Sequence, residues 1–159
     1  VMVFAKTHAA AGKMSALIAE GKMAKEYYAV VRGEPENKSG IFEDLLFKDS
    51  SKNKSYVVKR MRKGVKKASL EYETQKTLTD GDKKYSLVKI KLHTGRTHQI
   101  RVQFSSRKMP LLGDGKYGGK CEGCKTALWS YSLSFLHPFT GKEIFVNEPA
   151  PSVYPWNMF

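Results

Sequence analysis

Two stretches of the sequence alternate between apolar and polar side chains, and this alternation constrains the fold more than any other feature. Residues 69–74 and 88–93 both follow it, and in the second stretch Val88, Ile90 and Leu92 alternate with two lysines and a histidine. A period of two is typical of a β-strand whose two faces differ in environment. The sequence therefore predicts a sheet with one buried face and one hydrated, basic face.

The rest of the chain predicts further strands together with two helices. An Ala-rich helix is expected from about His8 to Met23, because Met14, Leu17 and Ile18 recur at helical spacing. The other expected segments are a strand over 1–7, a strand over 25–33, a loop over 34–40, two strands joined near Gly64 within 56–74, a hairpin turn over 80–84, a Gly-rich loop over 110–119 and a strand–turn–strand unit over 127–149. With 159 residues, the chain has the length of about one α+β domain.

The charge balance points to a polyanionic partner. Lys and Arg number 28 against 15 Asp and Glu, which gives a net charge of +13, and the pI is near 9.7. Solubility alone is usually achieved with mixed signs, so we favour nucleic acid as the partner. The densest group of cations is either a solvated hairpin or a site of contact with an RNA backbone, and it consists of Lys59, Arg60, Arg62, Lys63, Lys66 and Lys67.

Several other classes of protein are disfavoured. No window approaches the roughly 18 apolar residues of a membrane span and no signal peptide is recognised, so we expect a soluble cytoplasmic protein without a membrane partner. The Gly-rich loop fits neither common phosphate-binding motif, which disfavours a nucleotide cofactor. Cys121 and Cys124 form a single C-x-x-C, which could be a redox pair or half of a zinc site. Because no second pair of ligands accompanies them, we expect loop cysteines without special chemistry and no metal.

The sequence "TGRTHQIR" at 94–101 concentrates hydrogen-bonding side chains where a strand is expected to become a helix. The guanidiniums of Arg96 and Arg101 lie close in sequence to the imidazole of His98 and the amide of Gln99. Each alone could be an ordinary surface residue. Together, at the first turn of a helix, they suit phosphates and a uracil-like base. We therefore interpret the junction as a binding surface.

The short helix after this junction is expected to have two distinct faces. Thr97 is the predicted N-cap, with the helix starting near His98. Helical spacing places Ile100 and Phe104 on one face and a polar trio on the opposite face. The polar trio consists of His98, Arg101 and Ser105. We expect the apolar pair to anchor the helix and the polar trio to meet a ligand.

Several motifs follow one another along nearly the whole chain. They are "VMVFAKT" at 1–7, K-x-Y-x-A-V-V-x-G at 25–33, "TGRTHQIRVQ" at 94–103, "GDGKYG" at 113–118, "ALWSYSLSFLHPFTG" at 127–141 and P-x-P at 149–151. In this order they resemble the RluA-type pseudouridine synthases. The TGR-x-HQIR motif is the most specific of them.

The resemblance implies a fold and an activity. The implied fold is a bent, mostly antiparallel mixed sheet with flanking helices and a basic cleft. The implied enzyme isomerises uridine to pseudouridine in structured RNA, either rRNA or tRNA, without a cofactor or metal. By motif match, Tyr27 would be the active-site tyrosine beside the flipped uridine, and Arg96 would pair with the catalytic aspartate. The resemblance also implies that the cleft is supported, and RNA contacted, by His98, Gln99 and Arg101.

One departure from the family pattern concerns the nucleophile. The family's catalytic aspartate lies in an H-R-L-D motif just before the segment equivalent to "VMVFAKT", and this sequence contains no H-R-L-D. The aspartates present all lie in other contexts: Asp44, Asp49, Asp80, Asp82 and Asp114. We therefore expect residues 1–159 to be a catalytic domain truncated at its N-terminal side and inactive by itself, with the aspartate upstream of Val1. The alternative is a non-catalytic RNA-binding module of the same fold. The sequence indicates neither the oligomeric state nor the target uridine.

Overall fold

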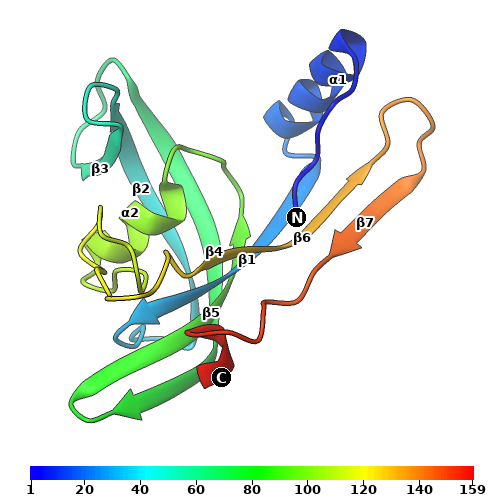
Figure 1. The fold of residues 1–159 in the computed structure, drawn as a ribbon. Helices are drawn as coiled ribbons and strands as arrows, with labels where there is room; N and C mark the ends of the chain where they lie inside the picture. The colour runs from blue at the N-terminus through cyan, green and yellow to red at the C-terminus, as the bar shows by residue number, and fades with distance from the viewer.

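One seven-stranded sheet organises the chain, and every strand pairing in it is antiparallel. A computed structural model describes all 159 residues, with the strand order β3-β2-β4-β5-β1-β6-β7 (Figure 1). The elements are α1 (His8–Ala19), β1 (Met23–Arg32), β2 (Ser39–Asp49), β3 (Lys54–Val58), β4 (Val65–Asp80), β5 (Lys83–Leu92), α2 (Gln99–Ser106), β6 (Leu128–Leu136), β7 (Glu143–Asn147) and the 3-10 helix η1 (Trp156–Met158). The predicted α+β class is confirmed, and the sheet contains no parallel pair.

The two alternating stretches form the central pair of strands, β4 and β5. Tyr72 lies opposite Ile90 in their register, and both side chains are buried. On the other face, Glu71 lies opposite Lys91 and residue 73 is a glutamate opposite a lysine. Opposite charges across a ladder stabilise it by about 0.2–1 kcal/mol per pair. The predicted hydrated face is therefore present, but along these strands its charges are balanced and not purely basic.

The main core lies between the sheet and α2. Ile100 and Phe104 point from α2 into a cluster with Val88 and Ile90, and Phe104 is completely buried. The ring of Phe104 packs edge-on against Phe42, with 5.1 Å between the centroids. Removing a buried ring of this size typically costs about 3–5 kcal/mol. The predicted role of Ile100 and Phe104 as the anchor of the helix is confirmed.

Strand β2 is an element that the sequence analysis missed, because residues after the expected loop over 34–40 lack a clear alternation. Phe42 and Leu46 are buried, but the inward position between them is occupied by Asp44. The Asp44 carboxylate lies 2.8 Å from a guanidinium nitrogen of Arg107 and also accepts a hydrogen bond from Gln103. A partnered carboxylate can occupy an inward position at acceptable cost. The local pattern does not reveal that partner.

The first seven residues do not form the predicted strand. The Val1 ammonium donates to the carbonyl of Ser130, whose hydroxyl donates to the Val1 carbonyl, and no further ladder develops. Helix α1 then begins with Thr7 as its N-cap, which accepts from the backbone N–H of Ala10. It ends at Ala19, and Gly21, the stop that the sequence suggested within the expected range of 8–23, follows with a φ of +69° that favours glycine.

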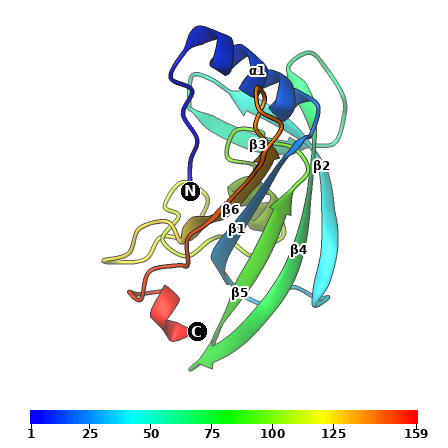
Figure 2. The ribbon, with the colours of Figure 1, turned by 90° about the vertical axis from the view of Figure 1, so that its right-hand side faces the viewer.

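The sheet is bent so that its two ends stand apart. In Figure 1, β2 and β3 rise at one end, the β6–β7 hairpin extends at the other, and the N-terminus lies between them. Helix α1 packs beside the β6–β7 end, where it lies far from η1 (Figure 2). The register of β1 against β6 skips one residue: Glu26 pairs with Ser132 and Tyr27 with Ser130, which leaves Tyr131 as the extra residue of a bulge. A bulge bends the strand that carries it.

Candidate functional site

Tyr27 lies in the middle of β1, on the sheet face that α2 covers. Its backbone is paired with Ile90 on one side and Ser130 on the other. The half-buried side chain packs against the main core and lines an apolar cavity of about 220 Å³ together with residues 1–4. Tyr28 packs against Tyr131 instead, with 4.8 Å between the ring centroids. Only Tyr27 therefore borders a space beside the N-terminal segment.

Arg96 lies in the exposed loop between β5 and α2. Its Nε donates to the carbonyl of Lys67 at 3.0 Å, and its side chain lines a different cavity from that of Tyr27. Tyr27, Ile90 and Tyr72 are level in the ladder. Two strand spacings and five residues of β4 therefore separate Tyr27 from the Lys67 backbone, about 10 Å across the sheet and about 17 Å along it. Arg96 is thus directed toward β4 and not toward Tyr27.

The loop that carries Arg96 is fixed by Gln99. The Gln99 side chain is almost fully buried, and its Oε1 accepts from the Arg96 backbone N–H at 3.0 Å and from the Thr94 hydroxyl at 2.8 Å. Its Nε2 donates to the carbonyl of Ser69. The prediction that Thr97 is the N-cap was wrong. The N-cap is residue 98, which has a φ of +54° and makes no capping bond, because the Gln99 amide organises the turn instead.

The predicted polar trio of α2 faces another part of the chain and not an open space. His98 Nδ1 lies 3.0 Å from the Tyr117 hydroxyl, and the Ser105 hydroxyl donates to the Tyr117 carbonyl. Arg101 donates twice to the fully buried Asp114, both bonds being 2.7 Å long. These side chains attach the "GDGKYG" loop to the helix. Together with Gln99, these three side chains form the packed layer beneath the loop of Arg96.

Tyr117 and Ser55 complete this network, and the sequence analysis assigned neither. The backbone N–H of Ser55 donates to the Tyr117 hydroxyl at 2.8 Å, while the Ser55 hydroxyl donates to the Thr97 carbonyl at 2.7 Å. Both residues are buried. The network joins β3 to the loop of Arg96, so the position of that loop depends on contacts between segments that are distant in the sequence.

Two pKa values in this network are displaced by burial. Burial, reinforced by the positive charges of Arg101 and Lys116, lowers the pKa of His98 from its usual value of 6.5. Burial also raises the pKa of Tyr117, so its phenol stays protonated at neutral pH. The His98–Tyr117 contact is therefore a bond between two neutral groups under ordinary conditions.

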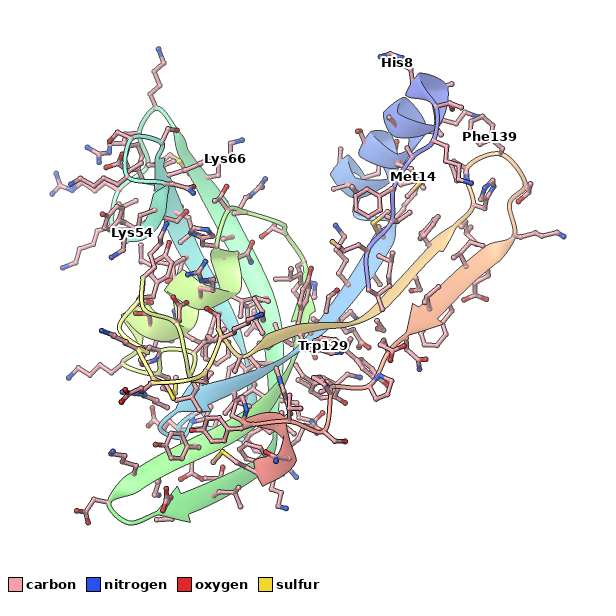
Figure 3. The ribbon with its side chains drawn as sticks, viewed as in Figure 1. His8, Met14, Lys54, Lys66, Trp129 and Phe139 are labelled. Carbon is pink, nitrogen blue, oxygen red and sulfur yellow. The ribbon has the colours of Figure 1, made fainter.

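The predicted cation run occupies the β3–β4 connection and the start of β4. Figure 3 shows Lys54 and Lys66 at this end of the sheet, away from His8 and Phe139 at the other. All members of the run are exposed. Lys66 lines the same cavity as Arg96, and Lys67 supplies the carbonyl that Arg96 binds. Lys59 instead borders a cavity that also contains two carboxylates.

The C-x-x-C pair lies apart from these residues. Cys121 and Cys124 are free, half-buried thiols that pack near η1. Burial raises the pKa of Cys124 to about 11. The structure contains no group of three or more His, Cys, Asp or Glu side chains that could hold a metal ion. Its helices are also too short or too polar to cross a membrane.

Comparison with known proteins identifies the family. The sequence pattern of the family described as RNA pseudouridylate synthase matches residues 1–106. The chain belongs to the RNA pseudouridylate synthase family. The resemblance predicted from the ordered motifs is thereby confirmed. Among solved structures, this pseudouridylate synthase fold is similar to Human RNA Pseudouridylate Synthase Domain Containing 1, with a TM-score of 0.77, 23% identity, and coverage of 95% of this chain and 64% of that chain.

Two curated members of the pseudouridylate synthase family illustrate the range of similarity. An RNA pseudouridine synthase of Aquifex aeolicus is 36% identical over 172 residues, which cover 98% of this chain and 52% of the relative. The ribosomal large subunit pseudouridine synthase D of Zymomonas mobilis is 30% identical over 161 residues, with 95% and 49% coverage. The chain thus spans about half the length of the curated relatives that it matches.

Proposed function

We propose that the protein to which this chain belongs isomerises uridine to pseudouridine in structured RNA, either rRNA or tRNA. Membership of the family supports this activity, and so do the names of relatives that act on the ribosomal large subunit and on tRNA. The observation that carries the proposal is the loop of Arg96. Buried Gln99 fixes this loop beside an exposed cation cluster, on the sheet face that also holds Tyr27.

The proposed chemistry uses three side chains: a carboxylate, an arginine and a tyrosine. A carboxylate from upstream of Val1 acts as nucleophile or general base on the uridine, and a guanidinium keeps it ionised through a charge-assisted hydrogen bond. Arg96 is the proposed partner, and Tyr27 the residue beside the base. Chemistry on a paired base requires it to leave the stack first. In this proposal, Arg96 releases the Lys67 carbonyl and turns toward the carboxylate when RNA and the upstream segment are in place.

The remaining site residues have supporting roles in the proposal. His98, Gln99 and Arg101 support the cleft through the contacts described above. His98 and Arg101 are also proposed to contact RNA, through the parts of their side chains that remain exposed. The backbone of the RNA is bound by Lys59, Arg60, Arg62, Lys63, Lys66 and Lys67. Neither metal nor nucleotide cofactor is part of the proposed reaction. The cytoplasm is the proposed location, since the ribosomal large subunit is the substrate named for several relatives.

Tritium release tests this activity. RNA containing 5-tritiated uridine is incubated with the protein extended upstream through H-R-L-D, because joining C5 to the sugar expels the tritium. We expect release from rRNA or tRNA. Arg96→Lys should slow it by about ten- to a hundredfold, because one charge-assisted hydrogen bond of about 1.5–3 kcal/mol is lost and an ammonium cannot replace the planar fork. No release from any cellular RNA class would contradict the proposal.

A non-catalytic RNA-binding module is the second candidate. Two observations favour it. Arg96 is hydrogen-bonded to the Lys67 carbonyl and not to a carboxylate. In addition, no aspartate of residues 1–159 lines the cavity of Tyr27. The same tritium assay separates the two candidates when it is paired with RNA binding. Binding without release, with the upstream segment present and folded, would support the module and exclude the enzyme.

A further inference from the structure

A small cationic cavity lies between β2, β3, β4 and the loop before α2. Its volume is about 230 Å³, and its lining contains three cations, Lys48, Lys66 and Arg96, but no carboxylate. Four other surface cavities have volumes of 220 to 510 Å³; three of them include carboxylates and the fourth is mostly apolar. The electrostatics of the cationic cavity therefore favour an anion.

The strand register holds the two lysines at a fixed separation. Leu46 lies opposite Lys66 in the β2–β4 ladder, and Lys48 lies opposite Ser55 in the β2–β3 ladder. Lys48 and Lys66 are therefore diagonal neighbours on one face of the sheet, with their Cβ atoms about 7 Å apart. Both side chains line the same cavity, so their ammonium groups repel each other there, and an anion placed between them relieves the repulsion.

The third cation is held against the same strands. The Nε of Arg96 donates to the Lys67 carbonyl, which leaves the terminal nitrogens of the guanidinium beside the cavity. The loop is fixed to β3 because the buried hydroxyl of Ser55 donates to the Thr97 carbonyl. When RNA is bound and Arg96 turns toward the carboxylate, the ammonium groups of Lys48 and Lys66 remain at the cavity and suit the oxygens of a phosphate, whereas a metal ion or another cationic group would be repelled.

We propose that this cavity is a subsite for one backbone phosphate of the RNA strand, at a nucleotide that flanks the target uridine. The inference rests on the proposed function, and it adds a position and a residue, Lys48, that the sequence analysis did not include. The Lys67 backbone lies about 10 Å across and about 17 Å along the sheet from Tyr27. That separation is too large for the phosphate of the target nucleotide itself. A substrate must therefore extend past the uridine toward β3 and β4, and uridine monophosphate cannot occupy both places.

Charge removal tests the subsite. The variants are Lys48→Ala, Lys66→Ala and the double variant. The control is Lys83→Ala, which removes another exposed lysine, at the start of β5 beside the opposite end of β4. Binding of a fluorescein-labelled RNA hairpin with a uridine-rich loop is followed by anisotropy over a range of salt concentrations. Thermal unfolding of each variant checks that the fold is retained.

We expect each single variant to bind several-fold more weakly, and the slope of log K against log salt to become shallower by about 0.7 in the double variant, which loses the contact with that phosphate. The double variant should lose less than the sum of the two, because both lysines contact the same phosphate. The control should match the unchanged chain. Uridine monophosphate should bind the unchanged chain and the double variant equally.

The alternative results are distinguishable. If Lys48→Ala and Lys66→Ala match the control, the subsite is wrong and so is the assignment of Lys66 to the RNA backbone, whereas the proposed isomerisation is unaffected. Fully additive losses would also overturn it, since they would indicate a diffuse positive field. If inorganic phosphate stabilises the unchanged chain but not the double variant, while RNA affinity is unaltered, the cavity binds a free ion and not RNA. Absence of any RNA binding by the unchanged chain would overturn both the subsite and the proposed function.

Discussion

At the scale of single residues, the ion pair of Arg101 and Asp114 is expected to have a large effect on stability. Asp114 is fully buried and accepts two hydrogen bonds of 2.7 Å from the guanidinium. Breaking a buried pair leaves a charge without its partner, so Asp114→Asn should lower the free energy of unfolding by about 3–5 kcal/mol. Urea unfolding followed by circular dichroism measures this. Lys84→Gln, which breaks an exposed pair with Glu34, should cost under about 1 kcal/mol. Equal losses in the two variants would contradict the assignment.

The displaced pKa of His98 predicts a pH dependence. Because its pKa is lowered in the folded state, the unfolded chain takes up the proton at a higher pH than the folded chain does. The resulting stabilisation is complete above pH 6.5 and is lost as the pH falls below it. His98→Asn keeps a residue that tolerates positive φ but removes the titration. The stability difference between the unchanged chain and this variant should shrink on acidification, as measured by urea unfolding on either side of pH 6.5. A constant difference would count against this.

The thiol of Cys124 should be protected by the fold. With a pKa raised to about 11 by burial, only about one thiol in a thousand is ionised near pH 8, and the thiolate is the reactive form. Iodoacetamide should therefore modify Cys124 slowly in the folded chain and much faster in urea, as followed by mass spectrometry. Similar rates in both conditions would mean that the thiol is exposed and that its burial is not maintained in solution.

At the scale of the elements, α1 and α2 should differ in local stability. No residue of α1 is buried, and Met14 and Leu17 alone pack onto the cluster around Met23, whereas α2 buries five of its eight residues. Hydrogen exchange should therefore remove protection from α1 well before α2, because local opening of α1 exposes little apolar surface. Thr7→Ala should widen the difference by removing a cap of about 1 kcal/mol. Protection of α1 equal to that of α2 would show that other contacts cover it.

The elements also show what a sequence can and cannot predict. The alternation around Val88 and Ile90 predicted β5 because burial on one face decides it locally. Strand β2 was missed because the inward-facing Asp44 breaks the apolar alternation. Its charge is balanced by Arg107, which lies 63 residues away in the chain. In the candidate site, the motifs located Arg96 and Tyr27. The long-range bonds of Gln99 and Tyr117 that hold the loop came only from the tertiary structure.

At the scale of the whole molecule, the net charge of +13 predicts how RNA binding responds to salt. If about four to six phosphates of a single strand are neutralised, the slope of log K against log salt should be about −3 to −4. The measurement is the binding of the labelled RNA hairpin by the unchanged chain between low and physiological salt. A flat dependence would mean that the cation excess is not the footprint of the RNA.

The extra residue in β6, Tyr131, affects how strongly the sheet bends. Lys25 pairs with Leu133 and Tyr27 with Ser130, on either side of Tyr131, so deleting residue 131 would keep these pairs but remove the hydrogen bond from the Glu148 N–H to the Tyr131 carbonyl. It would also remove the local kink, because an unbulged strand is straighter. We expect the direction of the β6–β7 hairpin relative to the cationic end to change. The bulge at Tyr131 thus contributes to the bend that separates the β6–β7 hairpin from the β2–β3 end of the sheet.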